Sequence, residues 1–170
     1  RLQHEHAASS RAPMARQPVS APGAPMSAPP PGTLYLVPNL LGLVAPETVL
    51  PARTLDIARH LRHWVVETEK PARAFLKTLG TPVPIADLHI APLPALPSAD
   101  HALLLAPCRS GTDLGLLSDA GCPGVADPGA RLVAAAHVAG VRVVPLVGPS
   151  SLLLALMASG MNGQSFAFHG

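Results

Sequence analysis

From Thr33 onward, short apolar runs alternate with stretches whose apolar residues recur at helical spacing. This alternation is typical of βαβ units, in which parallel strands form a sheet and helices cover its faces. The runs of strand length are 33–37, 63–67, 88–90, 101–106, 114–117 and 141–147. The pattern therefore predicts an α/β domain built on a parallel sheet.

Helices are predicted between these runs: from Pro51 to near Leu61, over 70–79, from Pro128 to a stop at Gly140, and from Gly148-Pro149-Ser150 through Met157 to Gly160. Pro71 lies where a first helical turn tolerates proline, and Gly80 lies where a helix C-terminus needs a positive φ. Asp127, followed directly by a proline, is predicted to cap the third helix.

Two proline-rich stretches interrupt this order. Residues 1–31 combine Pro, Ala and Ser without periodic apolar positions, so burial cannot offset the entropy of ordering them. We expect a disordered tail there, with Met26 as a hypothetical native start. Residues 81–100 hold five prolines and are predicted to be mostly extended linker. The predicted organisation is thus a tail over 1–31 and one α/β domain over 32–170.

Composition narrows the type of core and says little about partners. Hydrophobic residues make up 48% of the chain but aromatic residues only 3%, so the core must consist of Leu, Val and Ala. Twelve basic and ten acidic residues are too evenly balanced to indicate an anionic partner. A local basic group is nevertheless present: Arg53, Arg59, His60, Arg62, His63, Lys70, Arg73 and Lys77. A solvated helix face and an RNA contact both fit this group.

The chain gives no sign of a structural metal or a membrane segment. Cys108 and Cys122 are the only cysteines, and neither has the Cys/His spacing of a zinc site. The longest apolar run, Leu152–Ala158, is far shorter than the ~20 residues of a membrane span, and the N-terminus shows no secretory segment. We therefore expect a cytoplasmic protein with reduced thiols, no metal and no membrane contact.

Three loops follow predicted strands: Pro38–Gly42, Ser118–Gly129 and Gly148–Ser151. In open parallel sheets such loops line a crevice at the carboxyl ends of the strands, where ligands bind. All three loops are thus expected to face one pocket. In the glycine-rich middle loop, Asp119 is predicted either to contact a ligand or to form an Asx-turn.

Two common nucleotide-binding motifs are missing from these loops. The chain has neither the G-x-x-x-x-G-K-[ST] pattern of a phosphate-binding loop nor a G-x-G-x-x-G pattern after its first strand. The expected ligand is therefore polar without being dominated by phosphate. A nucleoside joined to an amino acid fits this description.

The motifs GTLYLVPNLLG (32–42), LLSDAGCPGVADPG (116–129) and VVPLVGPSS (143–151) together resemble the tetrapyrrole methylase superfamily. Within it, they resemble the ribosomal RNA small-subunit methyltransferases that modify a cytidine ribose 2′-oxygen. The resemblance runs from Gly32 to Gly170 and implies an S-adenosyl-L-methionine-dependent methyltransferase of two domains, usually a homodimer. The cofactor would lie in the cleft between the domains. This chain would then be the N-terminal domain, ending before the second.

The resemblance also implies which residues contact the cofactor. Carried over position by position, they are Leu40, Gly42, Ser118, Asp119, Ala120, Cys122, Ser150 and Ser151. For Ser150, helix capping is an alternative role.

Two motifs depart from the RNA-modifying group. That group usually has T-P-I-G-N in the first loop, where residues 39–43 are N-L-L-G-L, and E-D-T-R where residues 67–70 are E-T-E-K. Both positions lie where the substrate is expected. Small-subunit ribosomal RNA is the predicted acceptor, with a tetrapyrrole or other small molecule as the alternative. An inactive fragment or non-catalytic binding domain is the third reading.

Methylation of a ribose hydroxyl requires that the hydroxyl lose its proton. Glu67, at the end of a predicted strand, is the candidate general base or a residue that orients one. The alternative for Glu67 is a structural ion pair with Lys70 or Arg73.

Overall fold

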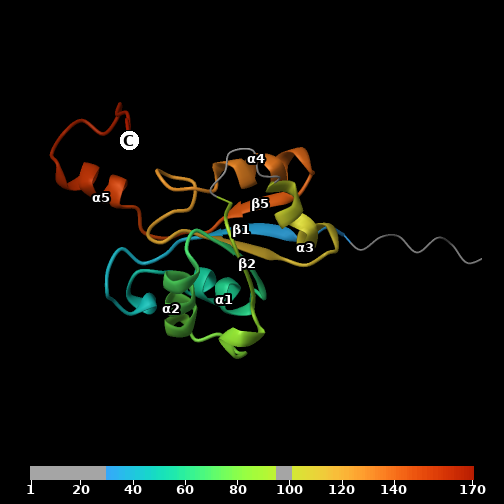
Figure 1. Ribbon diagram of the computed structural model, residues 1–170. Coiled ribbons are helices and arrows are strands. Elements are labelled where there is room, and N and C mark those ends of the chain that lie inside the picture. The colour runs from blue at the N-terminus through green and yellow to red at the C-terminus, as the bar shows by residue number, and fades with distance from the viewer. Residues whose placement is uncertain (1–29, 95–100) are drawn as a thin grey trace, which may run out of the picture.

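The computed structural model describes residues 30–94 and 101–170. Their strands are β1 (Thr33–Val37), β2 (His63–Val66), β3 (His89–Pro92), β4 (Leu114–Leu117) and β5 (Arg142–Pro145). They form one sheet in the order β3-β2-β4-β1-β5, in which every pair is parallel (Figure 1). The predicted α/β fold class is confirmed. The hypothetical start at Met26 and nearly all of the predicted tail lie outside the described residues.

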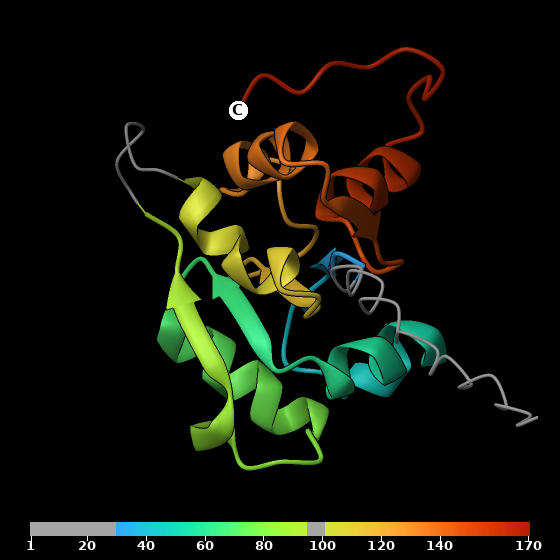
Figure 2. The same cartoon turned by 90° about the vertical axis from the view of Figure 1, so that its right-hand side faces the viewer.

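The α-helices are α1 (Ala52–His60), α2 (Glu69–Leu79), α3 (Ala106–Arg109), α4 (Ala130–Val138) and α5 (Ser151–Ala158). Short 3₁₀ helices are η1 (Pro46–Thr48), η2 (Ile85–Asp87) and η3 (His101–Leu105). Helices α1 and α2 cover one face of the sheet, whereas η3, α3 and α4 cover the other (Figures 1 and 2). The result is a three-layer sandwich with a separate hydrophobic cluster on each face.

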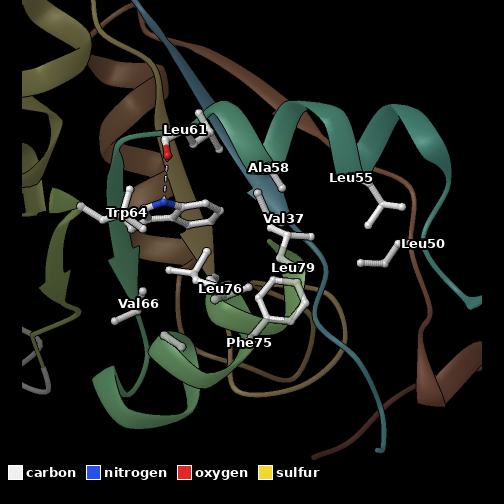
Figure 3. Close-up of a cluster of buried hydrophobic side chains, with 13 residues drawn as sticks. Val37, Leu50, Leu55, Ala58, Leu61, Trp64, Val66, Phe75, Leu76 and Leu79 are labelled. Atoms are coloured by element: carbon white, nitrogen blue, oxygen red, sulfur yellow. Dashed lines mark hydrogen bonds between the residues drawn. The ribbon is translucent and has the colours of Figure 1, made fainter. Parts of the chain in front are cut away.

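The core beneath α1 and α2 contains Trp64, the largest fully buried side chain of the described residues (Figure 3), although the composition had predicted a core of Leu, Val and Ala. Its indole N–H donates to the Leu61 carbonyl oxygen at 3.3 Å, which satisfies the one polar group of a side chain only 1% exposed. Gly115 in β4 lies in register between Trp64 on β2 and Tyr35 on β1. A Cβ atom at Gly115 would lie 2.6 Å from the indole ring, so only glycine leaves room for it.

The strand predicted over 101–106 is wrong, because this segment forms η3 and leads into α3. The buried residues of η3 and α3 are His101, Leu105 and Cys108, at positions i, i+4 and i+7. That spacing places one face of a helix against the second core cluster. The segment connects β3 to β4 along the chain and covers one face of the sheet, so only one of its sides is buried. The apolar run had suggested a strand that is buried on both faces.

The predicted cap of α4 is also wrong. The helix begins at Ala130, with Gly129 at the N-cap position, so Asp127 lies outside it and caps nothing. A Cβ atom at Gly129 would lie 2.9 Å from the Leu116 side chain, so the chain comes close to β4 just before the helix starts. The remaining predicted elements are confirmed to within a few residues, and α2 ends at Gly80 with a φ of 76° as predicted.

Helix α5 stands away from the sheet (Figure 1). None of its residues is buried, and its exposed side chains include Leu153, Leu154 and Met157. In the part of the chain that the structure describes, no helix combines the length and apolar character needed to cross a membrane.

Candidate functional site

The topology itself creates a crevice between β1 and β4. The chain leaves β1 toward α1 on one face of the sheet and leaves the neighbouring β4 toward α4 on the other. Loops that depart in opposite directions from adjacent parallel strands leave a gap at their carboxyl ends, and ligands bind there in open α/β sheets. The first and middle predicted loops are the two that flank this gap.

Asn39 joins the first loop to the middle loop. Its side chain is 5% exposed, and its amide group donates to the carbonyl oxygens of Ser118 at 2.9 Å and Asp119 at 3.1 Å. Its backbone N–H donates to the Gly121 carbonyl oxygen at 2.8 Å, while its side-chain oxygen accepts the N–H of Leu40 at 2.7 Å. One buried residue therefore satisfies polar groups of both loops. The sequence placed Asn39 in the first loop, at the expected pocket, but did not predict its hydrogen bonds to the middle loop.

Glu67 contacts the same loop from the other side. One of its carboxylate oxygens accepts the backbone N–H of Asp119 at 2.9 Å. Among the described residues Glu67 makes no ion pair, and Arg73 instead pairs with Glu69 at 3.3 Å. The predicted alternative of an ion pair with Lys70 or Arg73 is therefore wrong.

The third loop crosses closely over the first. A Cβ atom at Gly148 would lie 2.3 Å from the Pro38 side chain, so the crossing requires glycine. The Cys122 thiol donates to the Pro149 carbonyl oxygen at 3.3 Å, which links the middle loop to the third. Burial raises the pKa of the Cys122 thiol, and the nearby Asp127 carboxylate adds to the effect. All three predicted loops thus meet at one edge of the sheet.

Two adjoining hollows lie among these loops. The larger, of about 390 Å³, is lined by Asn39, Leu40, Leu41, Gly42, Leu43, Pro71, Ala74, Phe75, Thr78, Asp119 and Ala120. The smaller, of about 130 Å³, is lined by Leu41, Ala120, Gly121, Cys122, Val125, Ala126, Asp127, Ser150, Ser151 and Leu152. Leu41 and Ala120 belong to both linings, so they mark the boundary between the hollows.

The residues implied by the resemblance divide between these hollows. Seven of them line one or both: Leu40, Gly42, Asp119, Ala120, Cys122, Ser150 and Ser151. The eighth, Ser118, is 2% exposed, and its hydroxyl donates to the Ala120 carbonyl oxygen at 3.0 Å, so it shapes the turn from below. Ser150 occupies the N-cap position of α5 without a side-chain capping bond, so the capping alternative is not realised.

Asp119 keeps its carboxylate free. Within residues 30–94 and 101–170, that side chain makes no hydrogen bond or ion pair, and the predicted Asx-turn is not formed. Asp119 is exposed and lines the larger hollow. An unpaired carboxylate here is available to accept hydrogen bonds from a ligand.

Some basic side chains of the predicted group are engaged within the protein. Arg59 pairs with Glu47 at 2.7 Å and donates to the Leu79 carbonyl oxygen at 2.8 Å. Arg73 is engaged by Glu69. In the described ranges, Arg53, Lys70 and Lys77 form no ion pair. Part of the group stabilises the packing of α1 against α2, and part of it remains accessible.

No group of three or more His, Cys, Asp or Glu side chains in the described part of the chain could hold a metal ion. Cys108 and Cys122 are both free thiols.

The chain is similar to curated proteins of one kind. Proteins named Ribosomal RNA small subunit methyltransferase I are 36% identical to it over 140 residues in Xylella fastidiosa and 32% identical over 145 residues in Escherichia coli O157:H7. Another from Vibrio cholerae is 34% identical over 143 residues. These alignments cover 81–82% of this chain but 45–49% of the relatives, so the chain spans about half the length of the curated relatives it matches. No family model matches the chain.

Proposed function

We propose a function from the premise that this chain belongs to the tetrapyrrole methylase superfamily, with the ribosomal RNA small subunit methyltransferases I among its homologues. The full-length protein is an S-adenosyl-L-methionine-dependent methyltransferase. The observation that carries this proposal is the meeting of three loops at the switch point between β1 and β4. Residues 32–170 would form the N-terminal domain and one wall of the cofactor cleft. The second domain would form the opposite wall.

The residues present suit this cofactor. The larger hollow combines apolar side chains such as Leu40 and Phe75 with the free Asp119 carboxylate, which fits a nucleoside that needs an apolar surface and an acceptor for its hydroxyl groups. The smaller hollow is lined by Ser150 and Ser151 at the start of α5 and by Asp127 of the middle loop. Hydroxyl groups and a carboxylate suit the charged amino-acid end of the cofactor.

The bound cofactor supplies an electrophilic methyl group, and the protein's task is to hold acceptor and donor in line. The residues that would contact and orient the cofactor are Leu40, Gly42, Asp119, Ala120, Cys122, Ser150 and Ser151. Ser118, predicted to contact it too, would instead shape the turn that presents these residues. Glu67, whose second carboxylate oxygen has no partner among the described residues, is the candidate to accept a proton or to orient the group that does.

The proposed acceptor is the ribose 2′-oxygen of a cytidine in small-subunit ribosomal RNA. The names of the relatives support an RNA substrate, and the accessible basic residues of α1 and α2 offer contacts for a phosphate backbone. One observation favours a small-molecule acceptor instead: of the residues that the structure describes, no Lys or Arg lines the larger hollow, and the mostly apolar 39–43 loop forms part of its lining. A cytoplasmic location and a homodimer belong to the same proposal.

Two measurements test the proposal on the full-length protein. Isothermal titration with S-adenosylhomocysteine should show saturable binding, and the absence of heat would end the enzyme proposal. Incubation with radiolabelled S-adenosyl-L-methionine and small ribosomal subunits that lack the modification should label the RNA. Label that enters only a low-molecular-weight product would transfer the proposal to the alternative acceptor.

A further inference from the structure

We infer that Asn39 and Glu67 are positioning residues that clamp the backbone of Asp119 from both sides and so present its free carboxylate to the ribose hydroxyls of the cofactor. This inference rests on the proposed function and deepens it. It gives a positioning role to Asn39, which the sequence only placed at the pocket. It also changes the role of Glu67 from accepting a proton to holding Asp119 in place.

The clamp closes on a single residue. The Glu67 carboxylate accepts the N–H of Asp119 at 2.9 Å, and the Asn39 amide donates to the carbonyl oxygen of the same residue at 3.1 Å. These two bonds come from different elements, the end of β2 and the end of β1. A loop residue held at both its donor and its acceptor loses most of its backbone freedom. Its side chain keeps no partner among the described residues, and Asp119 lines the larger hollow.

The hydrogen bonds of the buried Asn39 side chain fix the orientation of its amide group. Its amide group also donates to the Ser118 carbonyl oxygen at 2.9 Å, and its side-chain oxygen accepts the Leu40 N–H. The amide must therefore face the middle loop with its nitrogen, because the reverse orientation would set an oxygen against two carbonyl oxygens. Position 39 therefore requires a side chain that carries both an N–H donor and an oxygen acceptor, as asparagine does.

The free carboxylate of Asp119 indicates what kind of ligand binds at the clamp. An ionised carboxylate only accepts hydrogen bonds, so its ligand must be a donor. In dinucleotide-binding sheets an acidic residue accepts a hydrogen bond from a ribose hydroxyl, and the ribose of the cofactor offers a pair of such hydroxyls. A carboxylate fixed by its backbone binds such a pair with less loss of entropy than a mobile one.

The experiment uses four variants of the full-length protein with S-adenosylhomocysteine as the titrant. Glu67→Gln keeps an acceptor for the Asp119 N–H but removes the charge and the basicity, whereas Glu67→Ala removes the acceptor. Asn39→Asp keeps the shape but replaces the donor, and Asp119→Ala removes the ligand contact. Asn162→Asp and Glu69→Ala, at exposed positions that make no contact with Asp119, are the matched controls; the Glu69 carboxylate pairs with Arg73 instead.

We expect Glu67→Ala, Asn39→Asp and Asp119→Ala each to weaken binding by about tenfold or more, as the loss of a hydrogen bond to a charged or buried group does. Glu67→Gln should bind with an affinity within about threefold of that of the wild type. Thermal unfolding monitors folding, and if Asn39→Asp does not fold, the contrast between Glu67→Gln and Glu67→Ala decides alone.

Two results would overturn the inference. One is wild-type affinity in both Glu67→Ala and a folded Asn39→Asp variant. The other is a large loss of kcat in Glu67→Gln at unchanged affinity, together with loss of the acidic limb of the pH profile, which would make Glu67 the proton acceptor. In either case the wild type still binds the cofactor, whereas failure of the proposed function would leave the wild type itself without binding.

Discussion

The surroundings of Cys108 lower the reactivity of its thiol, and its side chain packs in the hydrophobic core. The side chain is 0% exposed and belongs to the hydrophobic cluster beneath η3 and α4. Burial raises the pKa of its thiol from 9.0 to about 11, and the Asp113 carboxylate acts in the same direction. The neutral thiol therefore persists where ordinary cysteines ionise.

This shift predicts a slow reaction of Cys108 with iodoacetamide. At pH 8 its thiolate is about a hundredfold scarcer than that of an unperturbed thiol, and its burial slows access further. In the native protein, Cys122 should be labelled first, because it is only partly buried. Peptide mass spectrometry over time checks the order, and labelling in urea should equalise the two rates. Equal rates in the native protein would contradict the assigned burial.

At the scale of single elements, the middle of β4 depends on glycine. Gly115→Ala would push a methyl group into the Trp64 ring, so we expect a loss of about 1–3 kcal/mol in the free energy of unfolding. Gly42→Ala is the control, since a Cβ atom there meets nothing within 4 Å and should change stability by less than about 0.5 kcal/mol. Urea denaturation of both variants measures the difference. Similar stability for the two would show that the indole ring moves aside freely.

The edge of the sheet carries a titratable contact. His63 on β2 and His89 on β3 are register partners whose rings stack with centroids 4.5 Å apart. Burial, and then the neighbouring His89 ring, lower the pKa of His63 below its ordinary 6.5. The unfolded chain therefore binds a proton more readily than the folded one as the pH falls below 6.5, so folding stability decreases there.

This linkage yields a pH-dependent prediction. The stabilisation is fully present above pH 6.5 and is lost as the pH falls through the lowered pKa of His63. His63→Phe keeps a stacked ring and should flatten the fall in unfolding free energy between pH 7.5 and 5. His137→Phe, on an exposed turn of α4, should keep the wild-type slope. If the two variants follow the same curve, the histidine stack does not cause the dependence.

For the molecule as a whole, α5 and the segments on either side of it form an apolar surface that the described part of the fold leaves uncovered. Its exposed side chains are Val147, Leu153, Leu154, Met157, Met161, Phe166 and Phe168. Apolar patches of this kind mark surfaces that contact another protein or another part of the same one. The proposed second domain and the proposed homodimer are both consistent with such a surface.

Changing this surface should alter association without altering the core. Leu154→Gln with Met157→Gln should change the unfolding free energy of the 170-residue chain by less than about 0.5 kcal/mol per site, since no residue of α5 is buried. The same change should lower self-association, measured by sedimentation. Leu132→Gln, at a position 0% exposed, is the control that should destabilise the chain strongly. A comparable loss of stability in the α5 variant would mean that α5 packs on the domain.

The sequence alone determined the fold class, because the period of apolar residues is local and reports strands and helices directly. Strand β4 over Leu114–Leu117 and the stop of α2 at Gly80 were predicted from such local signals. It also placed three loops at one edge, since parallel strands share their carboxyl ends.

The tertiary structure alone decided what those loops do to one another. Helices η3 and α3 form where a strand was predicted, because only one side of this segment meets the sheet. An apolar run does not show which side of a segment will be buried. The clamp on Asp119 joins residues 39, 67 and 119, which are 28 and 52 positions apart along the chain. Hydrogen bonds across such separations depend on strand order and register, and these are set only when the whole sheet packs.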